Sequence, residues 1–250
     1  MIPDPLDSFR RAAAGVLARM ERAFVERALA LPGVVLGKAA NSVRDAVASE
    51  AQQALAAAEM LARLPHHLAD MLADSWRGRG ARPLTPRERL TTADVFGYRA
   101  RPDLLRIVNG PGLSSIPRAA FSNRNPAITI GNTIYLNPAS KWPARDLTTS
   151  RDGSGTELLM HEVMHTIQYR ELGYSRFLAR YGADMAAAKG DANEMYRYQK
   201  RGRPFDREML EGQAQMVGNY QRLKDSTDPK DQTRRADLRR RLKGTGLHGL

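Results

Sequence analysis

Apolar side chains recur with two different periods along the chain. Over residues 5–75, and again from about 155 to 223, they repeat every three or four positions, which is the period of an amphipathic helix. Between these regions, "LLRIV" (104–108) and "AITIGNTIYL" (127–136) are apolar runs rich in β-branched residues, which predict strands. A small sheet with flanking helices is an α+β architecture, and we expect a mostly helical one.

The strand run at 127–136 carries a turn signal at its centre. Gly131 and Asn132 separate two alternating apolar halves, and two residues of this type between strands indicate a tight hairpin. A single strand with a bulge at the glycine is the alternative.

The N-terminal region is expected to form an antiparallel pair of helices. Pro32 and two glycines in "LPGVVLGK" (31–38) interrupt the helical period within residues 5–75. We expect the apolar face of the pair to pack on the rest of the protein. An amphipathic segment on a membrane surface is the alternative.

A boundary is expected near residue 80, in the basic, loop-like stretch "RGRGARPLTPRERL" (77–90). Within it, Thr85 and Glu88 have the spacing of a capping box and Pro86 occupies the first helical position, so a short helix is predicted to start there. We therefore divide the chain into a helical N-terminal region (1–80), a central domain (81–224) and a basic C-terminal tail (225–250).

The C-terminal sequence "RRADLRRRLKGTGLHGL" (234–250) is strongly basic. We expect a solvated helix face that frays into a disordered end. A surface for nucleic acid or an anionic membrane is the alternative, which the scarcity of aromatic residues for base stacking weakens.

Composition restricts the chemistry. The 250 residues include no cysteine, which excludes disulfides, thiolate metal sites and a cysteine nucleophile, so any metal must be held by His, Asp or Glu. The net charge of +12 favours anionic partners without identifying one.

No export or membrane signal is visible. Charged residues, among them Asp4, Asp7 and Arg10, interrupt any apolar start. The longest apolar stretch, around residues 28–37, is about half the length that a bilayer-spanning helix needs. We expect a cytoplasmic protein as synthesised, exported, if at all, by a route without a signal peptide.

The stretch "LLMHEVMHTIQY" (158–169) has the HExxH pattern of a zinc site. On a helix, His161 and His165 lie side by side next to a buried apolar stripe, which suits two nitrogen ligands. Glu162 lies about 100° further round, close enough to reach a water molecule on the metal without ligating it. Gly173 stands where a helix end is expected.

A catalytic zinc usually has a third protein ligand. A metzincin is excluded because Gln168 and Glu171 stand where it needs glycine and histidine, and Glu171 lies too far along the same helix. Glu208 and Glu211 in "FDREMLEGQAQMVGNY" (205–220) remain. Helix periodicity favours Glu211, because Ala214 and Gly218 share its face and would let two helices approach closely. Glu208 would then support the site or face solvent.

Other histidines and tyrosines receive lesser roles. The adjacent His66 and His67 point in different directions, and His248 lies near the chain end, so all three are expected at the surface. Tyr196 and Tyr220 are candidates for an oxyanion donor, and Gln168 and Tyr220 for support of the ligands.

Three blocks, "ITIGNTIYL", "LLMHEVMHTIQYRELG" and "LEGQAQMVGNY", resemble the zincin-like metallopeptidase domains of bacterial contractile injection systems. These include type VI secretion spike-linked effectors and core domains of extracellular injection systems. With the lead-in "LTPRERLTTADVFGYR", the resemblance covers roughly residues 84–222. Gly212 departs from it, standing where the family often has a larger polar residue.

The resemblance implies a gluzincin-like site with His161, His165 and Glu211 as Zn²⁺ ligands and Glu162 as the catalytic glutamate. It implies a zinc metallopeptidase of the bacterial effector or toxin type, acting on a protein or peptide and exported through contractile injection. A secretion-apparatus or immunity-type protein would bind the N-terminal helices. A non-catalytic, zinc-stabilised cargo or adaptor module is the alternative, and a basic nucleic-acid binder a third.

Overall fold

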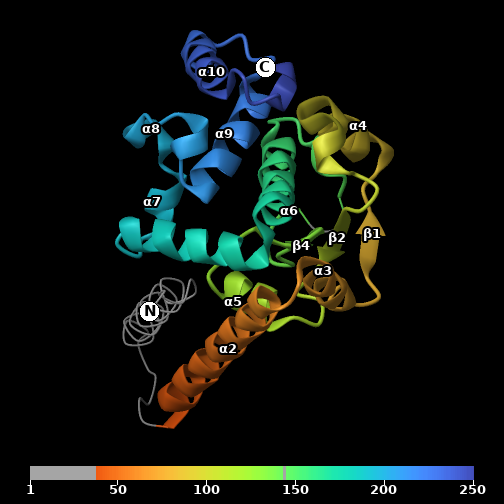
Figure 1. The fold of residues 1–250 in the computed structure, drawn as a ribbon, viewed down its shortest axis with the longest axis vertical. Coiled ribbons are helices and arrows are strands. Elements are labelled where there is room, and N and C mark those ends of the chain that lie inside the picture. The colour runs from red at the N-terminus through yellow and green to blue at the C-terminus, as the bar shows by residue number, and fades with distance from the viewer. Residues whose placement is uncertain (1–37, 143–144) are drawn as a thin grey trace.

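The computed structural model describes residues 38–142 and 145–250 as a small mixed sheet surrounded by helices (Figure 1). The strands are β1 (Ala81–Pro83), β2 (Arg106–Asn109), β3 (Ala127–Ile130) and β4 (Thr133–Leu136). The helices are α2 (Lys38–Arg63), α3 (His66–Ser75), α4 (Pro86–Phe96), α5 (Ser115–Ser122), α6 (Ser154–Ala187), α7 (Ala192–Tyr196), α8 (Tyr198–Arg201), α9 (Leu210–Leu223) and α10 (Pro229–Leu242). Short 3₁₀ turns are η1 (Gly97–Ala100), η2 (Leu147–Thr149), η3 (Phe205–Arg207) and η4 (Leu247–Gly249). The predicted α+β class is confirmed.

The sheet has the strand order β1-β2-β4-β3. Strands β2 and β4 are parallel, and the two outer pairs are antiparallel. Strands β3 and β4 form the tight hairpin that was one of the two expectations, with Ile130 opposite Thr133 across a two-residue turn. Gly131 has a φ of 56° there, and a Cβ at this position would lie 2.1 Å from the hydroxyl oxygen of Tyr174. Only glycine fits this turn.

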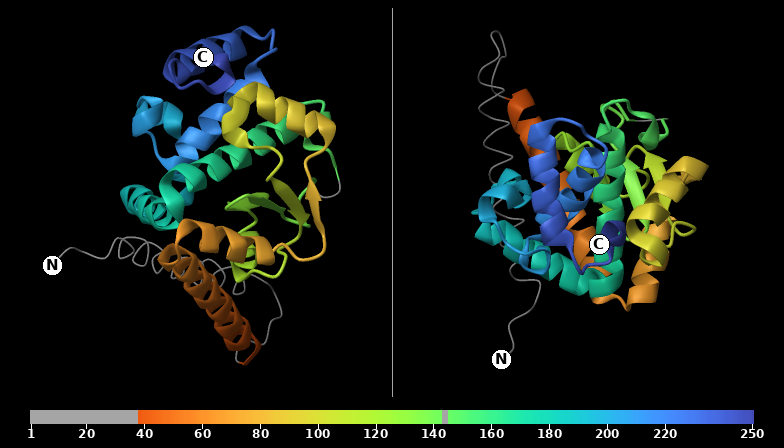
Figure 2. Two further views of the ribbon diagram at one scale, coloured as in Figure 1. Left: turned by 45° about the vertical axis from the view of Figure 1, so that its right-hand side comes forward. Right: turned by 90° about the horizontal axis from the view of Figure 1, so that it is seen from above.

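The two faces of the sheet are buried against different helices. Ile134 and Leu136 belong to the cluster around α6, whereas Tyr135 between them packs with residues of α2 and α3. This alternation is the period of two that a strand requires. The views of Figure 2 show α6 and the α2–α3 pair on opposite sides of the strands. Because both faces are covered there, every residue of β4 is buried, and the centre of β2 is buried as well.

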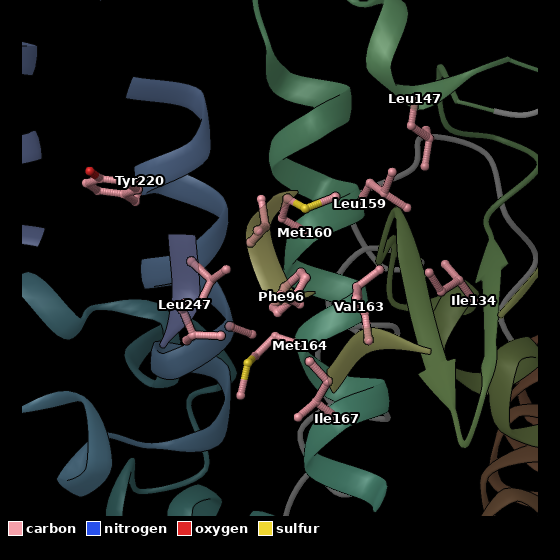
Figure 3. Close-up of a cluster of buried hydrophobic side chains, with 14 of the residues drawn as sticks. Phe96, Ile134, Leu147, Leu159, Met160, Val163, Met164, Ile167, Tyr220 and Leu247 are labelled. Carbon is pink, nitrogen blue, oxygen red and sulfur yellow. The ribbon is translucent and has the colours of Figure 1, made fainter. Parts of the chain in front are cut away.

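Helix α6 is central to the main core (Figure 3). Its predicted apolar stripe is buried and packs between the sheet on one side and α4 and α9 on the other; the stripe consists of Met160, Val163, Met164 and Ile167. The stripe fixes the rotation of α6, and therefore the direction of the polar residues between its members.

Gly173 interrupts the helix at the position where a helix end was predicted. It has a φ of 73° and a ψ of 164°, which only glycine adopts without strain. The helical pattern predicted beyond it is also present, because α6 changes direction at Gly173 and continues to Ala187 (Figure 1). The glycine signal did not indicate that the second segment would follow without a loop.

The first member of the predicted N-terminal helix pair lies outside the described residues. The second is broken in two at Pro65, which lacks an N–H and disfavours a helical residue before it, so α2 ends at Arg63 and α3 begins at His66. The apolar side of both packs on the protein as expected, with Leu61 and Ala69 buried. None of the described helices is long and apolar enough to cross a membrane.

The predicted disordered C-terminal end is wrong. Residues 229–242 form α10, whose Leu238 and Leu242 enter the main core together with Leu247 of η4. The arginines obscured this pattern, because three leucines carry the burial while Arg239 and Arg240 between them face solvent. Asp228 caps the helix by accepting a hydrogen bond from the backbone N–H of Lys230 at 2.7 Å.

Between the N-terminal helices and the HExxH helix, the strand predicted at 104–108 is present as β2, and the helix predicted after residue 85 is present as α4. The capping box is present: Thr85 accepts from the N–H of Glu88, and the carboxylate of Glu88 accepts from the N–H of Thr85. Strand β1 and helix α5 were not predicted. Strand β1 has three residues and ends in proline, so it is too short to show an alternation of apolar and polar residues. The local signal for α5 is its N-cap, Ser114.

Candidate metal centre

Two imidazoles project from the first segment of α6. His161 and His165 lie one turn apart, with ring centroids 4.8 Å from each other and their Nε2 atoms 3.1 Å apart. Both side chains are about 6% exposed. The buried stripe described above anchors this turn of the helix, so the two rings converge as the spacing predicted.

Glu211 supplies the third group from the first turn of α9. Its Oε2 lies 3.1 Å from Nε2 of His161 and 3.2 Å from Nε2 of His165. Helix α9 reaches this position because it crosses α6 closely: a Cβ at Gly218 would lie 2.7 Å from the backbone oxygen of Glu157. The predicted choice of Glu211 over Glu208, and its reason in the small residues of that face, agree with the structure.

The three atoms are spaced as a metal ion requires. Ligands of a tetrahedral zinc at 2.0–2.1 Å lie about 3.3 Å from one another, close to the separations of 3.1, 3.1 and 3.2 Å that His161, His165 and Glu211 show. Within the described residues these three buried side chains form a group that could hold a metal ion. Two imidazole nitrogens and one carboxylate oxygen are a donor set that zinc accepts.

Gln168 fixes the tautomer of His165. The Nδ1–H of His165 donates to Oε1 of Gln168 at 2.7 Å, so Nε2 is the nitrogen that faces the triad and would be the one to bind a metal ion. The amide nitrogen of Gln168 donates in turn to the backbone oxygen of Leu210 and to Oε1 of Gln213. The predicted supporting role of Gln168 thus has a physical form, a buried bridge between α6 and α9.

The carboxylate of Glu162 is bound to the sheet and its charge also acts on His165 of the triad. The hydroxyl of Thr129 on β3 donates to Oε2 of Glu162 at 2.7 Å, and both side chains are buried. Glu162 lies beside His161 in sequence and contributes no atom to the group of three. This placement matches a carboxylate that acts near a metal without ligating it.

Aromatic rings enclose the centre. The ring of Tyr196, from α7, stacks on His161 at 5.7 Å and 17°, and the ring of Phe177 meets His165 edge-on at 6.2 Å. The hydroxyls of Tyr181 and Tyr196 lie near Glu211, whose negative charge acts on both phenols. Since an ionised carboxylate only accepts hydrogen bonds, a phenol beside it can act only as a donor.

The electrostatics of the centre favour an ionised Glu211. Burial alone would raise its pKa, but the charge of His165 and the hydrogen bonds of both imidazoles outweigh burial and hold the pKa well below its usual range. Burial would lower the pKa of His165, yet Glu211 outweighs it and raises that pKa to about 9. Burial and the negative charge of Glu211 raise the pKa of Tyr181 and Tyr196, so both phenols stay protonated donors.

Glu208 has a role apart from the triad and does not face solvent. It is fully buried, with Oε1 accepting from Nε of Arg201 at 2.6 Å and Oε2 lying 3.4 Å from Arg241. Its Oε1 also accepts from the N–H of Met209 at the start of α9. Glu208 therefore anchors the helix that carries Glu211. Gly212 fits here, since a Cβ would press on the Glu208 side chain at 2.7 Å.

Tyr220 does not support the ligands as predicted. It lies near the C-terminal end of α9, whereas Glu211 lies in the first turn, and its ring packs against His248 at 4.6 Å. His248 is consequently not the free surface residue that was expected; its Nε2–H donates to the backbone oxygen of Val217. His66 and His67 are exposed as predicted, and Glu171 pairs with Arg99.

Four side chains of the centre were not anticipated from the sequence: Thr129, Phe177, Tyr181 and Gln213. Gln213 lies within the block "LEGQAQMVGNY", two residues after Glu211, and this position was the signal that the sequence offered for it. Thr129 and Tyr181 reach the centre only through the packing of β3 and the bend at Gly173, which leave no local pattern.

Comparisons with protein-family models, with curated proteins and with solved structures find no match to this chain. The relation to the zincin-like domains therefore stays a prediction. The chemistry of the centre is therefore inferred from its own side chains.

Proposed function

We propose that the chain is a zinc-dependent peptide-bond hydrolase with a zincin-like, gluzincin-type centre. One observation carries this proposal: Nε2 of His161, Nε2 of His165 and Oε2 of Glu211 converge at 3.1 to 3.2 Å, with the carboxylate of Glu162 beside them but outside the group. A purely structural zinc site has no need of the additional buried carboxylate.

Zinc held by the three ligands would act as a Lewis acid, which polarises a carbonyl group and lowers the pKa of water toward neutrality. Glu162 is the group placed to accept a proton from that water and to return it to the leaving amine. The Thr129 hydroxyl occupies Oε2 of Glu162, which orients the carboxylate and leaves Oε1 for the proton. His165 stays in the correct tautomer through Gln168.

Strand β3 offers a place for an extended substrate. It is an edge strand of the sheet, so in the described part of the chain one side of β3 has no neighbouring strand. In a hairpin closed by two residues, Ile130 and Thr133 bond to each other, and the backbone groups of Thr129 point away from β4. A peptide added along that side would run past Glu162.

A non-catalytic zinc-stabilised module is the second candidate. It is favoured by the depth of the centre, since His161, His165 and Glu211 are each about 6% exposed and a tyrosine ring lies on His161. In that case the ion would join α6 to α9, and Glu162 would have no catalytic role. The resemblance to contractile injection systems accommodates both candidates, as an exported effector or as cargo that binds the apparatus or an immunity-type protein.

The test is zinc content per chain, measured by elemental mass spectrometry on protein purified without chelators or affinity metals, followed by hydrolysis of a mixed peptide library. We expect one zinc in the wild type, its loss in His161→Ala and Glu211→Ala, and peptide cleavage that Glu162→Ala abolishes while retaining zinc. Glu171→Ala, on the same helix but paired with Arg99, is the matched control. Zinc without cleavage in any peptide pool favours the structural candidate; no zinc overturns both.

A further inference from the structure

The α7 segment, defined here as residues 188–197, closes the metal centre from one side. Its Tyr196 stacks its ring on His161 and lies near the carboxylate of Glu211, and the residue is partly exposed to solvent. Tyr181 also lies near Glu211, but it belongs to the second segment of α6 and packs against two buried clusters. The two phenols therefore differ in how they are anchored.

The α7 segment has little attachment to the main core. Its buried Ala188 and Met195 pack in a small cluster of their own with Met185 and Met209, separate from the clusters that contain the sheet. The next residue after the segment, Tyr198, is by contrast part of the main core, and its hydroxyl oxygen accepts a hydrogen bond from the side-chain amide of Asn219 at 2.9 Å. Motion of the α7 segment would therefore leave α8 and the core in place.

Backbone conformations at both ends of the α7 segment suit a hinge. Lys189 and Gly190 have φ angles of 53° and 75°, so the chain leaves α6 through two successive left-handed residues. At the other end, Arg197 has a ψ of 50° and separates α7 from α8. Such element-terminal positions are where closure motions are absorbed.

The side chain of Arg201 ties the α7 segment to the start of α9. Arg201, on α8, donates to the backbone oxygens of Glu194 and Met195, the latter at 2.8 Å, and these belong to the last turn of α7. The same guanidinium binds the buried carboxylate of Glu208, which precedes the ligand helix α9. Arg201 is thus a latch between the α7 segment and the helix start that carries Glu211.

From these contacts we propose that the α7 segment is a hinged cover, that Tyr196 seals the metal centre, and that ions and substrates enter only when the Arg201 latch releases it. The inference rests on the metal centre of the proposed function. It explains how a centre with nearly buried ligands can exchange its contents: the rigid part, with Tyr181, Gln168 and α9, keeps the ligands arranged while α7 opens.

The test is the rate at which zinc-loaded protein releases its ion to an excess of a chromophoric chelator, followed by stopped flow. Tyr196→Ala removes the seal and Arg201→Gln removes the latch while leaving Tyr196 intact. We expect release at least tenfold faster in both variants, with one zinc per chain still bound at the start. Tyr98→Ala, at a tyrosine that is 91% exposed, and Arg207→Gln, at an exposed arginine of η3, should release zinc at the wild-type rate.

Hydrogen exchange separates opening from unfolding. In Arg201→Gln, the backbone amides of residues 192–197 should exchange faster than in the wild type, while those of residues 158–169 keep their protection. Wild-type release rates and wild-type exchange in both site variants would overturn the cover while leaving the metal centre intact. A wild type that binds no zinc would remove the metal centre itself, and the cover with it.

Discussion

The amide of Gln168 lies between the two helices that supply the ligands. Its oxygen accepts from Nδ1–H of His165, and its nitrogen donates to Leu210 and Gln213 across the gap between α6 and α9. One side chain therefore sets both the tautomer of an imidazole and the distance between helices. This series of hydrogen bonds ends at Phe205, whose backbone oxygen accepts from the side-chain amide of Gln213 at 2.8 Å.

Replacement of Gln168 by leucine keeps its volume and removes both functions. We expect zinc to bind 10- to 100-fold more weakly, the usual cost of deleting a group that orients a ligating histidine. A competition titration against a chromophoric chelator measures the dissociation constant. Gln215→Ala is the control, because that glutamine bonds to Glu157 and Asn219 away from the centre. An unchanged dissociation constant in Gln168→Leu would mean that His165 is oriented by packing alone.

At the scale of elements, the crossing of α6 and α9 determines the ligand geometry. His161 and His165 belong to one helix and Glu211 to the other, so a change in their separation changes the triad directly. Gly218 marks the closest approach, with Glu157 of α6 opposite it. Helix packing at such a point depends on a missing side chain.

A methyl group at this crossing should therefore act on both stability and metal binding. In Gly218→Ala, the added carbon would meet the backbone oxygen of Glu157 at 2.7 Å, and backbone cannot give way as a side chain can. We expect a loss of about 1–3 kcal/mol in the free energy of unfolding, as for other overpacked sites, and weaker zinc binding. Urea unfolding measures the first. Gly80→Ala, where nothing lies within 4 Å of the added carbon, should change neither.

Elements with a local signal were predictable, and those without one were not. The helical period placed His161 and His165 together, and the small residues Ala214 and Gly218 selected Glu211 correctly. Thr129 could not be assigned, because its contact with Glu162 joins residues 33 positions apart through the packing of a strand on a helix. Turn signals such as Gly131 locate a hairpin but not the helix that will lie against it.

At the scale of the whole molecule, the C-terminal residues pack into the main core, a feature called the C-terminal closure below. Leu238, Leu242 and Leu247 complete the core around α6, and His248 inserts beside Tyr220. This closure was missed because arginines dominate the local composition, while the burial depends on residues brought together from α4, α6 and α9. The domain that holds the metal centre therefore shares its core with the segment expected to be a tail.

His248 makes this closure sensitive to pH. Burial lowers its pKa from 6.5 to about 4, with the nearby charge of Lys224 adding to the effect. The folded protein therefore binds fewer protons at His248 than the unfolded chain between these values, and its stability is complete above pH 6.5 and falls as the pH drops toward 4. The contribution is at most about 3 kcal/mol, from 1.36 kcal/mol per pKa unit.

The variant His248→Gln tests this closure, because it keeps a donor for the backbone oxygen of Val217 but cannot take up a proton. Urea unfolding of metal-free protein between pH 7 and 4.5 should give a wild type that loses more stability on acidification than the variant, so the gap between them narrows or reverses as the pH falls. His67→Gln, at an exposed histidine, should follow the wild type. A difference in the free energy of unfolding that stays constant with pH would mean that His248 is protonated equally in the folded and unfolded chains. The C-terminal closure would then be maintained by its leucines, with no shift in the pKa of the imidazole.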